Sequence, residues 1–354
     1  MTQKELNTYA GIGGGMNTFV PTATNWQAGG LLLVEYSRNV RSFPINRYAQ
    51  LVPVSAPIGL WPQINPVDAF RLVGTNQNVW PEGSDAPEGK DQQVQWNTYT
   101  TTRYAYPFQF SSKAAQVAAW DVVASHARQK AQLAMTDRTR AALAVLTTSG
   151  NWPTTNYAAT AGAITGGGSW SSSSTTQNYI QNTIRGVGIQ VEYATGGAVT
   201  LDDLNLIISP AQCKTMVATA EIQAYLVNNV NTLGYLTGND PTYNKYGLPS
   251  KLFGVNVIVE NTISNTVVQG AATQTTGYLL GATTALFTAR MGGLMGQAEV
   301  PQGVNTIQIN AFEDMTVEQM DDTWNRTTKG RVVQDIAPVL AAPLSGFYIA
   351  STAS

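Results

Sequence analysis

Charged residues are scarce in this sequence of 354 residues. Asp, Glu, Lys and Arg make up 12% of the chain, which is about half of the ~25% found in ordinary soluble proteins. Gly, Ser, Thr, Asn and Gln fill the gap. Because surface charge is what keeps a soluble monomer from associating, this composition indicates that neighbouring copies cover much of the surface.

Cysteine and histidine are represented by one residue each, Cys213 and His126. A lone Cys excludes an intrachain disulfide, and the lone His excludes metal sites built from several His or Cys ligands. His126 falls in the middle of an expected helix, without the surroundings that a Ser-His-Asp triad needs. We therefore expect no catalytic residue, no metal and no cofactor, and we interpret the chain as a non-enzyme.

Long apolar runs are also lacking. No stretch approaches the ~18 apolar residues of a membrane span, and the first residues contain no run of signal-peptide length. The net charge of -2 argues against a basic nucleic-acid-binding protein. We expect a protein made in a reducing cytoplasm, with no membrane partner.

The few charges are unevenly distributed. The net charge is +2 over residues 1–50, -2 over residues 51–110 and +3 over residues 111–149, which leaves -5 for the remainder. The acidic residues of the second segment gather in a Gly- and Pro-rich loop tip. Opposite local charges predict that this tip meets a basic arm or spine surface of another copy, and the candidate contact residues are Glu82, Asp85, Glu88, Lys90, Asp91, Arg38 and Arg41.

Two consecutive segments are unusually long. From Val94 to Phe110, aromatic and β-branched residues alternate with other residues, a period of two that predicts a single strand. Such a strand would span roughly 55 Å at ~3.3 Å per residue, so it should project from a compact domain. From Ser112 to Ser149 there is no Gly or Pro, and an Ala-rich apolar stripe predicts a long helix.

The rest of the chain mixes helices and strands without the regular alternation of a doubly wound sheet, which predicts the α+β class. Helices are expected over residues 176–193 and 212–227. Strands are expected over residues 202–209, 255–259, 286–289 and 346–350, and residues 306–312 and 331–336 are expected to pair as a hairpin.

This order of elements resembles the major capsid proteins of tailed bacteriophages, typified by phage Hong Kong 97, whose fold is shared with encapsulins. The segments that carry the resemblance begin at about residue 30, and beyond the long strand and helix they are residues 136–143, 206–212, 246–249 and 277–281. The resemblance implies an α+β Hong Kong 97-type phage capsid fold. Its expected parts are an N-terminal arm (1–47), an extended β-loop with flanking strands (48–110), a peripheral domain with the long spine helix (111–150), an axial domain (151–304), a peripheral-domain return hairpin (305–340) and a C-terminal axial-domain strand (341–354).

The resemblance also implies a function. Copies would assemble into hexamers and pentamers of an icosahedral virion head that encloses double-stranded DNA, after synthesis in the cytoplasm of a bacterial host. Portal, scaffolding or decoration proteins are expected partners, and contact with the packaged DNA should be weak and non-specific. The positive spine supplies candidates for the inner face, namely Arg128, Lys130, Arg138 and Arg140.

Two alternatives remain open at this point. An encapsulin-type shell would share the fold but hold an enzyme cargo. A β-rich carbohydrate-binding or adhesin protein is the alternative from another class, and it rests on the Gly, Thr, Asn and Tyr content of the chain.

Overall fold

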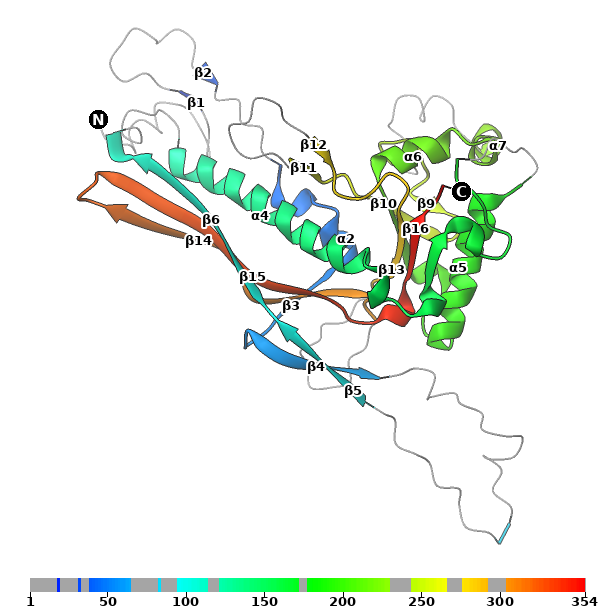
Figure 1. Ribbon diagram of the computed structural model, residues 1–354. Helices are drawn as coiled ribbons and strands as arrows, with labels where there is room; N and C mark the ends of the chain where they lie inside the picture. Colours follow the sequence, from blue (N-terminus) through cyan, green and yellow to red (C-terminus); the bar gives the residue numbers. More distant parts are fainter. Residues whose placement is uncertain are drawn as a thin grey trace.

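The computed structural model describes residues 18–19, 31–32, 38–64, 82–83, 94–113, 121–171, 177–229, 243–265, 276–291 and 304–353. Figure 1 shows two main parts, a six-stranded sheet flanked by α5, α6 and α7, and the long helix α4 lying along a four-stranded sheet. In the described part of the chain, three two-stranded sheets lie outside these two. They are β1 (Thr18–Phe19) with β2 (Leu31–Leu32), β4 (Ile58–Ile64) with β5 (Val94–Thr100), and β11 (Ile263–Asn265) with β12 (Thr276–Tyr278). Short 3-10 turns lie between the elements at Val40–Ser42, Ser149–Asn151, Thr154–Asn156, Ala161–Ala163, Leu201–Asp203 and Pro343–Ser345.

The six-stranded sheet has the order β7-β16-β13-β8-β10-β9. β8 runs parallel to β10 and antiparallel to β13, and the C-terminal strand β16 pairs with both β13 and β7. The strands expected near residues 202–209, 255–259, 286–289 and 346–350 are confirmed. The six strands are β7 (Tyr157–Thr160), β8 (Leu204–Ile208), β9 (Lys251–Leu252), β10 (Val255–Val259), β13 (Ala285–Ala289) and β16 (Phe347–Ser351).

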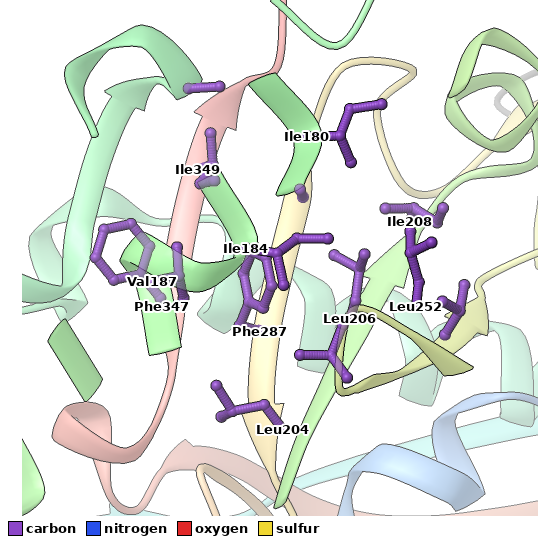
Figure 2. Close-up of a cluster of buried hydrophobic side chains, with 14 of the residues drawn as sticks. Ile180, Ile184, Val187, Leu204, Leu206, Ile208, Leu252, Phe287, Phe347 and Ile349 are labelled. Atoms are coloured by element: carbon purple, nitrogen blue, oxygen red, sulfur yellow. The ribbon is translucent and has the colours of Figure 1, made fainter. Parts of the chain in front are cut away.

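Both faces of this sheet are covered, which explains why residues 206–208 of β8 form a continuous apolar run rather than an alternating one. On one face, side chains of α5 (Tyr179–Thr195) pack against the strands (Figure 2); the cluster includes Ile184, Leu206 and Phe287. On the other face, Ile207 and neighbouring strand residues pack against α2 (Ile45–Tyr48) and the C-terminal half of α4. This second cluster also contains residues of the four-stranded sheet, so one core joins the two sheets.

Helix α5 confirms the helix expected over residues 176–193 and explains the two glycines inside it. A Cβ atom on Gly186 would lie 2.6 Å from a methyl carbon of Ile164, and one on Gly188 would lie 2.5 Å from a methyl carbon of Leu201. Glycine lowers intrinsic helix stability, but here it allows neighbouring segments to approach the helix closely. The helix ends at Gly196, which adopts the left-handed conformation with a φ of 61°.

The helix expected over residues 212–227 is wrong as a single element, because the structure has two helices there, α6 (Pro210–Val217) and α7 (Ala220–Asn229). Thr219 separates them. Its hydroxyl donates a hydrogen bond to the Met216 carbonyl (2.6 Å) and accepts one from the Ile222 amide (3.4 Å), so it ends the first helix and caps the second. The preceding corner has Ser209 as N-cap and Pro210 in the first turn of α6.

The four-stranded sheet has the order β3-β14-β15-β6, with β3 at Gln50–Pro53. The expected hairpin exists but is much longer than predicted, because β14 (Ile307–Asp322) and β15 (Thr327–Leu340) pair from Ile307–Leu340 to Asp322–Thr327. Register shifts interrupt the ladder between Ala311 and Thr316. Charged residues on the exposed part of β14 hid its alternation from the sequence pattern.

The long strand predicted from Val94 to Phe110 is in fact two strands, β5 (Val94–Thr100) and β6 (Thr102–Ser111). β5 pairs with β4 (Ile58–Ile64) in a separate two-stranded sheet, whereas β6 pairs with β15. Thr101 lies at the change of partner, where its amide donates to the Pro57 carbonyl (2.8 Å). The predicted alternation is confirmed on β6, where the even-numbered aromatic residues face α4. At Thr101 the pattern shifts by one residue, so that over residues 97–100 of β5 the odd-numbered side chains are the less exposed ones.

Helix α4 spans Val122–Leu146, shorter than the helix predicted from Ser112 to Ser149. Residues 112–113 are helical and residues 114–120 lie outside the described part. Asp121 caps α4, since its carboxylate accepts a hydrogen bond from the Ala124 amide (2.9 Å). The imidazole of His126 stacks against Phe108 and Phe110 of β6 (ring centroids 6.0 and 5.8 Å apart), so this His has a packing role.

A carboxylate from α7 caps the N-terminus of α5. Asn178, the N-cap of α5, makes no side-chain cap, and Glu221 instead accepts hydrogen bonds from the amides of Ile180 and Gln181, both at 2.9 Å. Glu221 is buried, so its removal leaves two buried donors unsatisfied.

We expect Glu221→Ala to lower the free energy of unfolding by about 1–3 kcal/mol, the cost of losing hydrogen bonds to a charged acceptor. Urea unfolding of the unassembled protein measures the change. Glu192→Ala removes the same charge from an exposed position of α5 and should change the stability by less than about 0.5 kcal/mol. Equal effects of the two variants would contradict the capping role.

Candidate assembly surfaces

The β4–β5 ribbon carries apolar side chains on an exposed face. β4 and β5 pair from Ile58–Thr100 to Ile64–Val94, which places alternate residues on opposite faces. One of these, here called the apolar face of the ribbon, consists of Ile58, Leu60, Pro62 and Trp96. Leu60 is 60% exposed and Trp96 is 61% exposed. Isolated two-stranded ribbons are only marginally stable in water, so this face has the properties of a surface that another protein covers.

The opposite face of the ribbon is packed by its own side chains. The ring of Tyr99 lies directly over Gly59, where a Cβ atom would come within 2.5 Å of the phenol oxygen. The phenol donates to the Ala56 carbonyl (3.3 Å), and the Asn97 amide group donates to Gln63 (3.0 Å). These contacts hold the ribbon in shape without covering the apolar face.

A second projecting element is the far end of the β14–β15 hairpin, where Trp324 is 91% exposed. The turn that presents it is well ordered by Asp322, whose carboxylate accepts hydrogen bonds from the Asn325 amide group (2.7 Å) and the Lys329 ammonium (2.9 Å). These two donors hold the pKa of Asp322 well below its usual range. The exposed Trp is therefore part of a defined turn, which is typical of an interaction surface.

Cross-strand ion pairs cover the sheet face that lies opposite α4. Arg331 pairs with Glu318, and Arg103 lies 3.5 Å from Asp335 and 3.8 Å from Glu313. Together with the pair between Lys329 and Asp322, these contacts balance each cation with an acid. This face is polar but has no marked excess of either sign.

A buried polar network fixes α4 on the four-stranded sheet. Arg138 is 5% exposed and donates to Asp314 (2.6 Å) and Gln334 (3.2 Å). Gln334 in turn donates to the Ala134 carbonyl (2.9 Å) and the Tyr106 hydroxyl (3.2 Å). Burial acts to raise the pKa of Asp314, but the hydrogen bond and charge of Arg138 outweigh it and lower the pKa.

The structure separates the predicted inner-face residues. Arg138 forms a buried pair with Asp314, and its role at an inner face stays a prediction. Arg140 pairs with Asp137 at 2.7 Å. Arg128 is exposed and Lys130 is partly exposed. Residues two positions apart on a helix point in directions about 200° apart, so these two side chains lie on opposite sides of α4. The positive charge of α4 is therefore not gathered on one face.

The predicted contact residues of the acidic tip fall mostly outside the described part of the chain. Glu82 lies in the described turn at residues 82–83 and is exposed. The others, Asp85, Glu88, Lys90 and Asp91, lie outside the described residues. Their role stays a prediction.

The two predicted arm residues have different surroundings. Arg41 is exposed, and its amide is held by the Asn39 side chain (2.9 Å) at the start of a 3-10 turn. Arg38 lies over the ring of Phe43, with its guanidinium carbon 4.4 Å from the ring centroid, and it donates to Ser42 (2.7 and 3.1 Å). Burial lowers the pKa of Arg38, and the charge of Glu260 opposes that shift.

Glu260 joins this segment to the six-stranded sheet. It is fully buried and accepts hydrogen bonds from the Tyr48 hydroxyl (2.8 Å), the Thr262 hydroxyl (2.5 Å) and the Thr262 amide (3.0 Å). Burial raises the pKa of Glu260 above its usual value, although these donors and Arg38 oppose the shift. Nothing in the local sequence pattern marked this residue, because its partner Tyr48 is 212 positions away.

Sites of other kinds are not found in the described part of the chain. No group of three or more His, Cys, Asp or Glu residues there is placed to hold a metal ion. No described helix is long and apolar enough to cross a membrane.

No family model matches the sequence, and no curated protein is significantly similar to it. Solved structures do resemble the fold. A phage-related protein from Bordetella bronchiseptica RB50 is 15% identical, with a TM-score of 0.59 over 87% of this chain and 92% of that protein. A chain in the capsid structure of the cyanophage P-SCSP1u is 11% identical, with a TM-score of 0.54 over 94% of each chain.

A chain in the mature capsid of bacteriophage PhiM1 is also 11% identical, with a TM-score of 0.54 over 93% of this chain and 91% of that one. The chain has the phage capsid-protein fold. The fold class expected from the order of elements is therefore confirmed.

The raised pKa of Glu260 gives this capsid-type fold a specific pH dependence. The folded state holds the proton more tightly than the unfolded state, so the contribution of Glu260 to stability is greatest below its usual pKa of 4.5. It declines as the pH rises from there through the raised pKa. Glu260→Gln should remove this decline, which urea unfolding between about pH 4 and pH 8 measures. The same pH profile in wild type and variant would contradict the assignment.

Proposed function

We propose that this chain is the major capsid protein of a tailed bacteriophage. Copies assemble into hexamers and pentamers of an icosahedral head that encloses double-stranded DNA. The observation that carries the proposal is the exposed apolar face of the β4–β5 ribbon on a subunit with the phage capsid-protein fold. The matched cyanophage and PhiM1 chains come from capsids, which supports a shell-building role.

Burial of the ribbon supplies free energy for assembly. Covering a Leu or Ile side chain fully stabilises by about 1.5–3 kcal/mol, and Ile58, Leu60 and Trp96 are each more than half exposed. In a ring of subunits, each copy places its ribbon on the next copy, and such head-to-tail contacts close when the rotation between neighbours closes. The contact is then repeated at every subunit, so a modest gain per copy stabilises the whole shell.

The two sheets correspond to the expected axial and peripheral domains. The six-stranded sheet draws strands from residues 151–304 and 341–354, and we assign these to the axial domain. The four-stranded sheet and α4 draw on residues 111–150 and 305–340, and we assign these to the peripheral domain. Residues 48–110 supply β3, the ribbon and β6, and we assign the projecting part of this segment to the extended loop.

The location in this proposal is the virion, after synthesis in the host cytoplasm, with the chain itself as the principal partner. Portal, scaffolding or decoration proteins complete the expected set. The subunit builds a shell and performs no catalytic step. The capsid function is preferred to an encapsulin or an adhesin because the matched assembled structures are described as capsids.

Electron microscopy of the purified full-length protein tests the proposal. Uniform closed shells are expected, either spontaneously or after addition of a scaffolding protein from the same genome. A protein that stays dispersed under both conditions would overturn it.

The ribbon provides a sharper test. We expect Leu60→Ser with Trp96→Ser to abolish or strongly reduce shell formation, because the double variant removes most of the apolar face. The matched control, Leu60→Ile with Trp96→Phe, keeps the face apolar and should assemble. Shells are counted by microscopy, and circular dichroism of the unassembled protein verifies that both variants are folded. Normal shells from the serine variant would contradict the proposal that the apolar face of the ribbon drives assembly.

The acidic tip is tested separately. If it meets a basic surface of another copy, replacing Glu82, Asp85 and Glu88 with Ser should impair assembly or change its dependence on salt, since exposed charge pairs are screened by salt. Light scattering at increasing NaCl concentration follows assembly. The control, Glu82→Asp with Asp85→Glu and Glu88→Asp, keeps the charge of the tip and should assemble as wild type. Identical salt curves for wild type and the tip variant would contradict the electrostatic contact.

A further inference from the structure

Three cations line one polar hollow beside α2. The hollow has a volume of about 460 Å³ and is open to solvent. Arg47 comes from α2, Lys251 from β9, and Arg290 follows β13, so the group exists only in the folded chain. Its polar lining is completed by the carboxamide side chains of Asn46, Asn205 and Asn256.

Strand register explains how the lining residues come together. Lys251 pairs with Asn256 and Asn256 pairs with Asn205, so the three side chains form a row across β9, β10 and β8. The row lies on the face of the sheet that also carries Ile207 and Ile258, two residues further along the strands. The apolar core thus ends where this polar row begins, and α2 borders the hollow above it.

The charge of the hollow is poorly compensated. Among the described residues that line it, none is Asp or Glu. Asp202 pairs with Lys251 at 3.1 Å, but both side chains are more than half exposed, so the pair contributes little. One N–H group of Arg290 donates to the Asn46 carbonyl, and a guanidinium has five such donors. Arg47 is exposed.

The geometry points to a binding site for the phosphate backbone of double-stranded DNA in this hollow. Arg, Lys and Asn side chains are typical phosphate-binding groups. Contacts to phosphates carry no sequence information, so binding is independent of sequence. The inference rests on the proposed function, because a head enclosing DNA presents one side of every subunit to phosphate.

The position of the hollow also indicates which side of the subunit faces the DNA. The hollow opens on the sheet face that α2 and α4 cover, whereas α5 and α6 cover the other face (Figure 1). The polyanion-facing side is therefore the α2 side. The cations of the hollow add to the exposed spine candidates, whereas Arg138 is buried against Asp314.

A DNA-binding measurement with matched variants tests the site. Fluorescence anisotropy of a short labelled duplex of arbitrary sequence is recorded with the full-length unassembled protein at several NaCl concentrations. Arg47→Gln with Lys251→Gln removes two contacts, and each contact contributes about 0.9 to the slope of log K against log salt. We expect the slope to become shallower by about 1.8 and the affinity at low salt to fall about tenfold or more.

Two controls isolate the position of the charges. Arg185→Gln with Lys214→Gln removes the same charges from exposed positions on α5 and α6 and should keep the wild-type slope. Arg47→Lys with Lys251→Arg keeps both charges in the hollow and should bind as wild type. Equal losses in the two glutamine variants, or no loss in the hollow variant, would overturn the site.

Microscopy of the same variants separates this inference from the proposed function. Shells that still form while DNA binding is lost support the hollow as a phosphate site. Impaired shell formation with unchanged DNA binding would show that the hollow receives an acidic segment of another protein copy, which also overturns the inference. Absence of shells from the wild-type protein would count against the proposed function, whatever the DNA measurement gives.

Discussion

The core that joins the two sheets is the constraint on which the rest of this structure depends. Ile207 and Ile258 of the six-stranded sheet, Leu143 of α4 and Ile309 of β14 belong to one buried cluster. Because protein cores are packed as densely as crystals, this cluster fixes the relative orientation of the two sheets. The network around Arg138 then holds α4 on the four-stranded sheet. The directions in which the ribbon and the long hairpin project follow from these contacts.

The projecting elements lie outside that core, and their composition differs accordingly. The ribbon exposes Leu60 and Trp96, and the hairpin turn exposes Trp324. A monomer with few charges and several exposed large apolar side chains is prone to association. In a shell subunit the same property is the driving force of assembly. The proposed shell therefore gives the scarcity of charge and the projecting elements one explanation, namely contact between copies.

Electrostatics distinguishes the sides of the subunit. On the four-stranded sheet, the face away from α4 balances its cations with acids through pairs such as Arg331 with Glu318. On the α2 side, Arg47, Lys251 and Arg290 share a hollow, and none of the other described residues that line it is an acid. A difference of this kind is expected when one side of a subunit meets a polyanion and another side does not.

The sequence by itself determined the α+β class, the long helix, which side chains of β6 face that helix, and four of the six strands of the larger sheet, because these depend on local periodicity. Tertiary structure decided where one strand changes its pairing partner and where one helix is divided into two. Thr101 divides one apparent strand because β4 and β15 each pair with part of it, and Thr219 divides one apparent helix. Tertiary structure also decided which charged side chains are buried in ion pairs and which are exposed. Arg138 and Arg47 are both arginines on helices, yet one is buried against Asp314 and the other lines an open hollow. Their partners are distant in sequence, so no local pattern encodes that difference.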